Sequence, residues 1–163
     1  MQKGTPMAKD KQHPDSDPMH YLLQQTYQLS RREIQAGFKE NNIELSPEQW
    51  SLISELAKED EQSPSELAKK TGRDKPSASR LIESLKKQEL VERVYGQQDR
   101  RAHLIRLTEK GRQLHEQLAP VHANIVEQSL QNFSAQEKEL LNEMLKKMYT
   151  NLRGDRITPD ESE

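Results

Sequence analysis

The segment SPSELAKKTGRDKPSASRLIESLKKQELVERVYGQQDRRAHLIRLTEKG, residues 63–111, decides the fold of this chain. Residues 63–66 place a serine cap, a proline and, three residues after the cap, a glutamate, a pattern that predicts the start of a helix. Thr71-Gly72 ends this short helix, because glycine readily adopts the left-handed conformation of a helix end. Asp74 is the predicted cap of a second helix, from about Lys75 to Gln88.

The second helix is amphipathic, and a change of periodicity follows it. Its predicted buried face has the spacing of a single helical stripe and consists of Ala78, Leu81, Ile82 and Leu85. Residues 90–95 and 102–107 are strand-like and are joined by a polar hairpin tip. Two helices joined by a tight turn and followed by a hairpin predict a winged helix-turn-helix.

Helices flank this segment on both sides. The sequence predicts one from Pro18 to about Lys39 and another that starts at Ser46, where Pro47 and Gln49 complete a capping box. Further helices begin after Thr108 and Ser134. The predicted fold class is therefore mainly α with a small β-hairpin.

Composition limits the classes of protein that fit. The chain of 163 residues has no cysteine, which excludes disulfides, thiolate metal sites and thiol redox sensors. It has no apolar run long enough to span a membrane and no apolar leader, so we expect a cytoplasmic protein without a membrane partner. Hydrophobic residues make up only 31%, and this lean core suggests that apolar surface is buried against a second copy.

Positive charge is concentrated where a groove-binding helix would lie. The chain has a net charge of −2, but residues 73–101 contain eight cationic and five acidic side chains. The exposed face of the second helix offers short hydroxyls for close approach, an arginine that can bind guanine, and lysines that can meet phosphates. In the hairpin tip, Asp99 can orient an arginine for the minor groove of double-stranded DNA. The candidate DNA-binding residues are Lys75, Pro76, Ser77, Ser79, Arg80, Ser84, Lys86, Lys87, Asp99, Arg100 and Arg101.

The segment resembles the core of the MarR (multiple-antibiotic-resistance regulator) family. The resemblance rests on Asp99-Arg100-Arg101, on LTEKG at 107–111 and on LSPEQW at 45–50. It implies a homodimer on a pseudo-palindromic operator, usually a repressor and often released by a small-molecule effector. In the resemblance, the wing residue that contacts DNA corresponds to Arg101, which Asp99 orients. The positions of the recognition helix that contact bases correspond to Pro76, Ser77, Ser79 and Arg80. The sequence departs from the family at Glu89, where a glycine is usual, so a left-handed turn there would be strained or reshaped.

The resemblance also implies how the chain is divided into domains. Residues 46–107 form the expected winged helix-turn-helix DNA-binding domain, while 18–45 and 108–152 form a helical dimerisation region with long N- and C-terminal helices. Residues 1–17 and 153–163 are polar and lack apolar periodicity, and we expect disordered tails there.

Three alternatives stay open at this point. A winged-helix scaffold that binds protein instead of DNA has the same local patterns, and Lys86-Lys87 could equally be a solvated charge run. His115 and His122, seven residues apart, could share one side of a helix, but a zinc site usually needs four ligands, so no metal or other cofactor is expected. No phosphate loop, nucleophile elbow or HExxH motif occurs, and we expect no enzyme.

Overall fold

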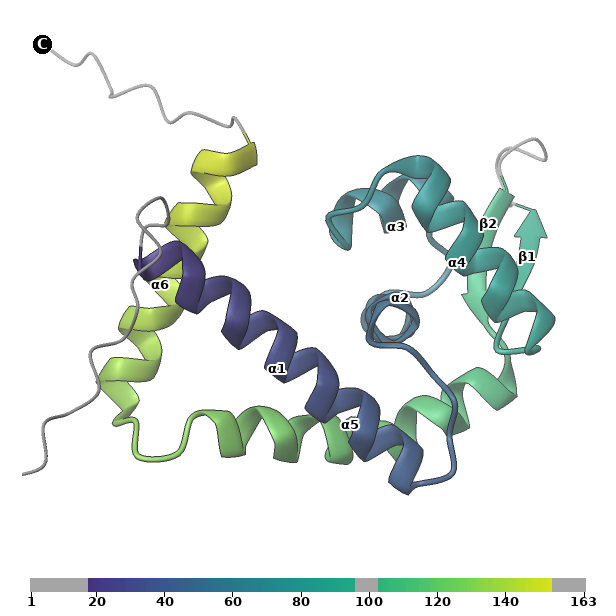
Figure 1. The fold of residues 1–163 in the computed structure, drawn as a ribbon. Helices are drawn as coiled ribbons and strands as arrows, with labels where there is room; N and C mark the ends of the chain where they lie inside the picture. Colours follow the sequence, from purple (N-terminus) through teal and green to yellow (C-terminus); the bar gives the residue numbers. More distant parts are fainter. Residues whose placement is uncertain (1–17, 96–102, 154–163) are drawn as a thin grey trace, which may run out of the picture. The chain divides into compact units, whose positions relative to one another are not determined.

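The computed structural model describes residues 18–95 and 103–153, which form six helices and a two-stranded antiparallel sheet (Figure 1). The residues up to Ile125 form one compact unit, and those from Val126 form a second. The elements, in chain order, are α1 (Pro18–Glu40), α2 (Pro47–Lys58), α3 (Pro64–Lys70), α4 (Lys75–Lys87), β1 (Val91–Tyr95), β2 (His103–Leu107), α5 (Glu109–Ser129) and α6 (Ala135–Arg153).

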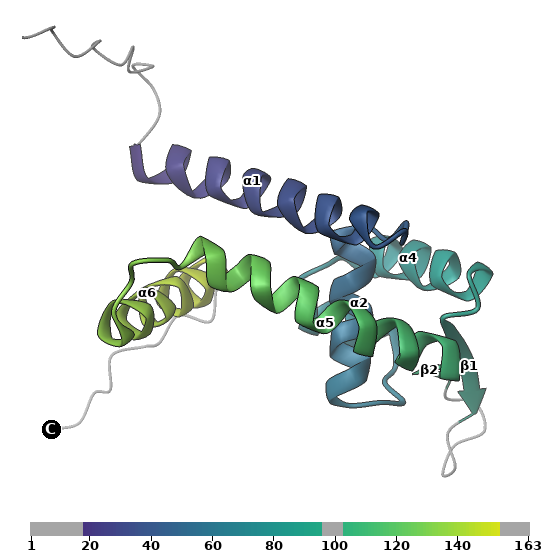
Figure 2. The same cartoon turned by 90° about the horizontal axis from the view of Figure 1, so that it is seen from below.

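The first unit contains the predicted winged helix-turn-helix. Helices α3 and α4 pack against each other, α4 contacts β1, and α2 contacts α1, α3, α4 and β2 (Figures 1 and 2). The strands pair in antiparallel register from Val91 with Leu107 to Tyr95 with His103. Fold class and element order are as the sequence predicts, and each strand begins one residue later than expected.

A third backbone segment, which no pattern in the sequence predicts, pairs with this sheet. Gln62, just before α3, donates its backbone N–H to the carbonyl of Ile105 at 3.1 Å and accepts from the N–H of Ile105 at 2.8 Å. The side chain of Gln62 is buried and donates to the carbonyl of Glu55 at 3.0 Å. The entry to α3 is thereby fixed to both the sheet and α2.

The helix starts agree with the predicted caps. Ser46 and Ser63 each form a complete capping box, and Asp74 accepts a hydrogen bond from the backbone of α4. The hydroxyl of Thr108 accepts from the N–H of Gly111 at 3.0 Å, and Ser134 forms the equivalent bond at the start of α6. Each cap satisfies a backbone donor that would otherwise lack a partner within its helix.

Three helices end in the same way. After α1, α3 and α4 a residue with positive φ reverses the chain, and these residues are Asn42 (φ 58°), Gly72 (φ 65°) and Glu89 (φ 60°). At the end of α4, Glu89 N–H donates to the carbonyl of Lys86 and Leu90 N–H donates to that of Leu85, the bond pair of a Schellman motif. The left-handed turn predicted at Glu89 is therefore formed, with a side chain where glycine fits best.

The core of the first unit joins all its helices to the sheet. Its fully buried members include Phe38 from α1, Leu52 and Ile53 from α2, Ile82 from α4 and Ile105 from β2. Gly111 of α5 lies so close to the main chain that a Cβ there would be 2.1 Å from the carbonyl oxygen of Leu90. The glycine of LTEKG is therefore required by a backbone contact between α5 and the residue before β1.

Two histidines of α5 lie against the tryptophan of α2. Trp50 is buried, and its ring is stacked on that of His115, with 5.2 Å between the ring centroids. The ring of His122 is tilted relative to that of Trp50, with 5.5 Å between the centroids. Phe38 meets Trp50 edge-on at 5.4 Å. Trp50 is therefore a residue of the core. Among the residues that the structure describes, no group of three or more potential ligands could hold a metal ion.

Apolar side chains remain exposed in each unit considered by itself. On α1 the exposed side chains include Leu22, Leu23 and Tyr27, and α6 has no buried residue at all. One apolar helical stripe of α6 consists of Leu141, Met144, Leu145, Met148 and Leu152, and it is exposed at Met144, Leu145 and Leu152 and half-buried at the other two positions. None of the described helices is long and apolar enough to cross a bilayer.

Replacing Glu89 by glycine should stabilise the protein. A residue other than glycine in the left-handed region carries a steric penalty of roughly 1 kcal/mol or more, part of which the greater flexibility of unfolded glycine offsets. The Glu89 side chain contributes little in return, because its Oε2 lies 3.8 Å from Lys110 Nζ and it is 83% exposed. We expect Glu89→Gly to raise the free energy of unfolding by about 0.5–1 kcal/mol in urea titrations.

Gly72→Ala is the matched control for this prediction. It introduces a Cβ at φ 65° with nothing within 4 Å of it, so only the backbone strain changes. It should destabilise the protein by a similar amount. A lower stability for Glu89→Gly would mean that the Glu89 side chain has a contact that outweighs its backbone strain.

The histidines predict a pH dependence of stability. Burial lowers the pKa of His115 and of His122, and for His115 the neighbouring Glu116 partly offsets this effect. Unfolded histidine binds a proton near pH 6.5 and the folded protein only at lower pH, so the unfolded state binds more protons between these values. The free energy of unfolding should therefore fall as the pH is lowered from about 6.5.

His115→Phe keeps a ring against Trp50 and removes one titrating group. In denaturant titrations between pH 7.5 and 5 (roughly the range that brackets histidine titration) this variant should lose less stability than the parent. Identical pH profiles would show that His115 does not contribute.

Candidate nucleic-acid interface

Helix α4 is held in place by its inner face and by its first turn. Ala78, Ile82 and Leu85 are buried in the core. At the N-terminus the carboxylate of Asp74 accepts from the backbone N–H and from the hydroxyl of Ser77, both at 2.8 Å. These hydrogen bonds from Ser77 lower the pKa of Asp74 below its ordinary value. The cap therefore stays charged at neutral pH, and the first turn of α4 is fixed.

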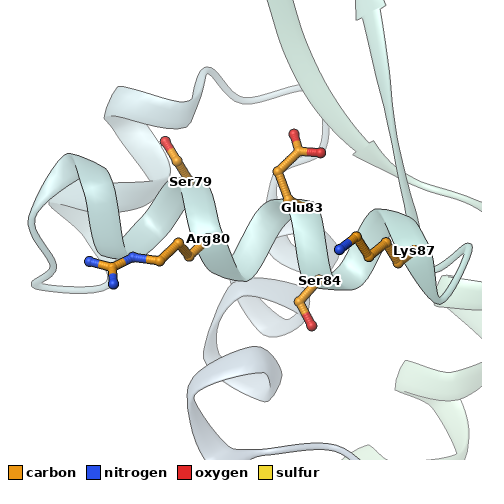
Figure 3. A pocket seen from close by; sticks show the side chains of 5 residues that line it. All are labelled: Ser79, Arg80, Glu83, Ser84 and Lys87. Carbon is orange, nitrogen blue, oxygen red and sulfur yellow. The ribbon is translucent and has the colours of Figure 1, made fainter.

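The hydroxyl of Ser84 anchors the same helix in its third turn. The sequence places Ser84 on the outer face, but in the structure it is half-buried and accepts a hydrogen bond from Gln49 Nε2 at 3.0 Å. Figure 3 shows Ser84 directed away from Ser79 and Glu83. Gln49 is the residue that also completes the capping box of α2, and its amide nitrogen remains free to reach α4. Ser77 and Ser84 thus both have partners within the protein.

The remaining candidates on α4 form an exposed face. Lys75 and Pro76 are exposed in the first turn, followed by Ser79, Arg80 and Lys87. A hollow on this face is lined by Ser79, Arg80, Glu83, Ser84 and Lys87 (Figure 3). Arg80 donates weakly from Nε to the carbonyl of Pro76 at 3.4 Å, which leaves the end of its guanidinium exposed.

The two adjacent lysines at the end of α4 differ. Lys86 is half-buried, and its Nζ lies 3.4 Å from Glu83 Oε2. Lys87 is exposed and has no ion pair within the described parts of the chain. Lys87 is therefore the better placed of the two for an external phosphate.

Glu83 is a residue of this surface that the sequence analysis did not select. Its Oε1 lies 2.6 Å from Nη2 of Arg93 on β1, which links α4 to the sheet. Glu83 is the only acidic residue of α4, and this was the one sequence signal that could have drawn attention to it. Its partner could not be inferred, because the contact depends on how the sheet packs on the helix.

The predicted wing residues Asp99, Arg100 and Arg101 lie outside the residues that the structure describes. The last described residue before the hairpin tip is Tyr95, and the first after it is His103. The centroids of their rings are 5.1 Å apart. Both residues are exposed. The structure therefore describes the base of the hairpin and leaves the contribution of its tip as a prediction.

The arrangement suits binding to an anionic polymer. One exposed helical face offers a small hydroxyl at Ser79, a guanidinium at Arg80 and ammonium groups at Lys75 and Lys87. A helix of this kind fits the major groove of B-DNA, which is about 12 Å wide.

Comparison with known proteins agrees with this geometry. The model of the MarR family matches residues 43–102, from the loop before α2 into the hairpin. YdgJ of Bacillus subtilis (strain 168), described as an uncharacterized HTH-type transcriptional regulator, is 32% identical over 108 residues, 66% of this chain and 66% of that protein. The HTH-type transcriptional repressor YetL of the same organism is 31% identical over 96 residues, 59% of this chain and 58% of that protein. The chain thus spans slightly less than two thirds of the length of these curated relatives.

Solved structures extend the similarity over most of the chain. BpsR of Bordetella bronchiseptica, whose DNA binding is regulated by 6-hydroxynicotinic acid, is 25% identical with a TM-score of 0.72, and the match covers 82% of this chain and 99% of that one. The transcriptional regulator PA3341 is 29% identical with a TM-score of 0.73, covering 83% of this chain and 98% of that one. The family model, these relatives and the winged helix-turn-helix agree, and together they support a MarR-type transcriptional regulator.

Proposed function

We propose that this protein is a homodimeric, ligand-responsive repressor that binds a pseudo-palindromic operator in double-stranded DNA. The observation that carries this proposal is the exposed face of α4, where Ser79, Arg80 and Lys87 project from a helix that is fixed at both ends. A rigid helix can present its side chains to base edges without losing much conformational freedom on binding.

Each exposed group of α4 has a role in this proposal. The fork of Arg80 suits the O6 and N7 atoms of guanine, and the short side chains of Pro76 and Ser79 allow close approach to the base edges. Lys75 and Lys87 would bind phosphates on either side of the groove. Ser77 and Ser84 would act mainly by fixing the helix, because their hydroxyls already have partners within the protein.

The hairpin tip supplies a second contact in this proposal. Arg101, oriented by Asp99 and flanked by Arg100, would enter the minor groove, whose negative potential is strongest in A/T-rich DNA. These three residues belong to the segment between Tyr95 and His103, which lies outside the residues that the structure describes.

Dimerisation would bring two such modules to one duplex. The exposed apolar stripe of α6 and the exposed apolar residues of α1 are surfaces that a second copy would bury. In a twofold dimer the two α4 helices should lie about 34 Å apart, one turn of DNA. A palindromic site follows from that symmetry.

Repression and its release by an effector are proposed from the relatives. YetL is a repressor, and the DNA binding of BpsR responds to a small aromatic acid. A regulator of this kind would act in the cytoplasm, where the chromosome of a bacterium is accessible.

Arg80→Ala should weaken binding to a duplex selected by the parent protein from a random-sequence pool. Loss of a bidentate arginine–guanine contact removes about 1–3 kcal/mol, so the dissociation constant should rise roughly 5- to 150-fold, with a relaxed preference at one base pair of each half-site. Fluorescence anisotropy at several salt concentrations measures both effects.

Arg32→Ala removes an exposed arginine from α1 and serves as the control. It should leave the affinity unchanged. If the parent bound DNA only weakly and without the salt dependence expected for phosphate contacts, the proposal would fail in favour of a winged-helix scaffold that binds protein.

Leu145→Lys should dissociate the dimer. Leu145 is exposed in the single chain, so the change should not disturb its fold, but a lysine buried at an interface without a partner costs several kcal/mol. We expect the dimer dissociation constant to rise roughly 100-fold or more, measured by sedimentation velocity. The same lysine at Glu143, on the other side of α6, should leave the dimer intact. Equal behaviour of the two variants would remove α6 from the interface.

A further inference from the structure

A pair of charged side chains bridges the exposed face of α4 and the sheet. Glu83 Oε1 accepts from Nη2 of Arg93 at 2.6 Å, and the other carboxylate oxygen of Glu83 lies 3.4 Å from Nζ of Lys86. Figure 3 shows Glu83 on the same side of α4 as Ser79. With Lys86 and Arg93 gathered around one carboxylate, the cluster keeps a net positive charge.

The register of the sheet explains why Arg93 reaches α4. Arg93 is paired with Ile105, and Val91, two residues before it, is paired with Leu107. Since alternate residues of a strand share a face, Arg93 lies on the face that carries the buried Val91, Ile105 and Leu107. Arg93 continues this face beyond the core to the edge of α4.

The other face of the same sheet carries a matching pair. Arg106 of β2 is paired with Glu92 of β1, and its Nε lies 2.8 Å from Glu92 Oε1. Arg93 and Arg106 are similarly exposed, at 45% and 41%, and each is bound to a glutamate of comparable exposure. Arg106 has a second, longer ion pair, in which its Nη1 lies 3.7 Å from Glu61 Oε1. They differ in the face of the sheet on which they lie.

The Glu83–Arg93 pair contributes little to stability. Ion pairs between side chains this exposed add little to the free energy of unfolding, because water screens them and ordering two long side chains costs entropy. A carboxylate that holds an arginine does, however, fix the guanidinium in one pose and leave its other N–H groups free for a second acceptor. The pair is therefore suited to positioning Arg93 for an external ligand.

We propose that Arg93 is a further DNA-binding residue, which binds the sugar–phosphate backbone at the edge of the groove that α4 enters, and that Glu83 positions it. This inference rests on the proposed DNA-binding function. A duplex with α4 in its major groove presents a phosphate backbone along each edge of that groove, and β1 borders α4 on one side. Arginine binds phosphate through two parallel N–H groups, and such a contact is independent of base sequence.

Arg93→Ala tests the contact itself. Binding should weaken roughly tenfold both for a duplex selected by the parent protein and for a duplex of unrelated sequence, since a phosphate contact carries no sequence information. The slope of log K against log salt concentration should become less steep by about 0.9 for each protomer bound.

Arg106→Ala is the matched control. It removes a similarly exposed, glutamate-bound arginine from the opposite face of the sheet, and we expect both affinity and salt slope to match the parent. If Arg93→Ala left the salt slope unchanged, or if Arg106→Ala reduced it equally, Arg93 would not be a specific phosphate contact.

A double-mutant cycle tests the positioning role of Glu83. Removing the Glu83 carboxylate takes a negative charge away from the DNA and also frees Arg93, and only the second effect depends on Arg93. We expect Glu83→Ala to weaken binding about threefold in the parent but to leave it equal or tighter in the Arg93→Ala background. Tighter binding by the same factor in both backgrounds would mean that Glu83 only repels DNA.

Arg80→Ala distinguishes a failure of the Arg93 contact from a failure of DNA binding through α4. If the parent binds the selected duplex and Arg80→Ala weakens it while Arg93→Ala does not, this inference fails and the proposed function stands. If the parent binds neither duplex, both fail.

Discussion

The structure depends on how the backbone turns at Leu90. The N–H of Leu90 donates to the carbonyl of Leu85 and so closes the end of α4, while the carbonyl of Leu90 accepts from the N–H of Thr108 at the start of α5. Gly111 in the first turn of α5 approaches that same carbonyl more closely than a side chain would allow. One residue thus joins the end of α4, the beginning of β1 and the start of α5, so the direction of α4 is coupled to that of α5.

This junction explains how a chain with few apolar residues can hold a helix rigidly. The inner face of α4 contributes only three buried side chains, but polar groups support the helix in its first, third and last turns. Asp74 fixes the first turn, Gln49 reaches Ser84 in the third, and the Schellman motif at Glu89 closes the last. Each of these bonds holds α4 in place without covering the face that carries Arg80. The helix can therefore be fixed to the protein while this face stays exposed.

The sequence predicts what is local and does not predict what depends on packing. Caps such as Ser63 and Asp74 and the stop at Gly72 are set by neighbours within a few residues, and all are predictable. At Glu89 the resemblance leaves open whether the left-handed turn is strained or reshaped, and the structure shows that it is formed. The Gln62–Ile105 pairing and the Ser84–Gln49 bond join residues 43 and 35 positions apart, and only the packed structure brings them together. Gln49 takes part in both kinds of interaction. The sequence predicts its role in the capping box, but not its hydrogen bond to Ser84, which depends on packing.

Local charge pairing makes a net charge of −2 compatible with binding to DNA. Acidic residues near the exposed face of α4 have internal partners: Asp74 is bound by the first turn of the helix, and Glu83 by Arg93 and Lys86. Lys75, Arg80 and Lys87 have no ion pair within the described residues. A duplex approaching α4 would therefore meet cations whose charge is uncompensated at short range, while at long range the protein as a whole repels it weakly. Such a distribution favours contacts that depend on close fit in a groove over indiscriminate attraction to polyanions.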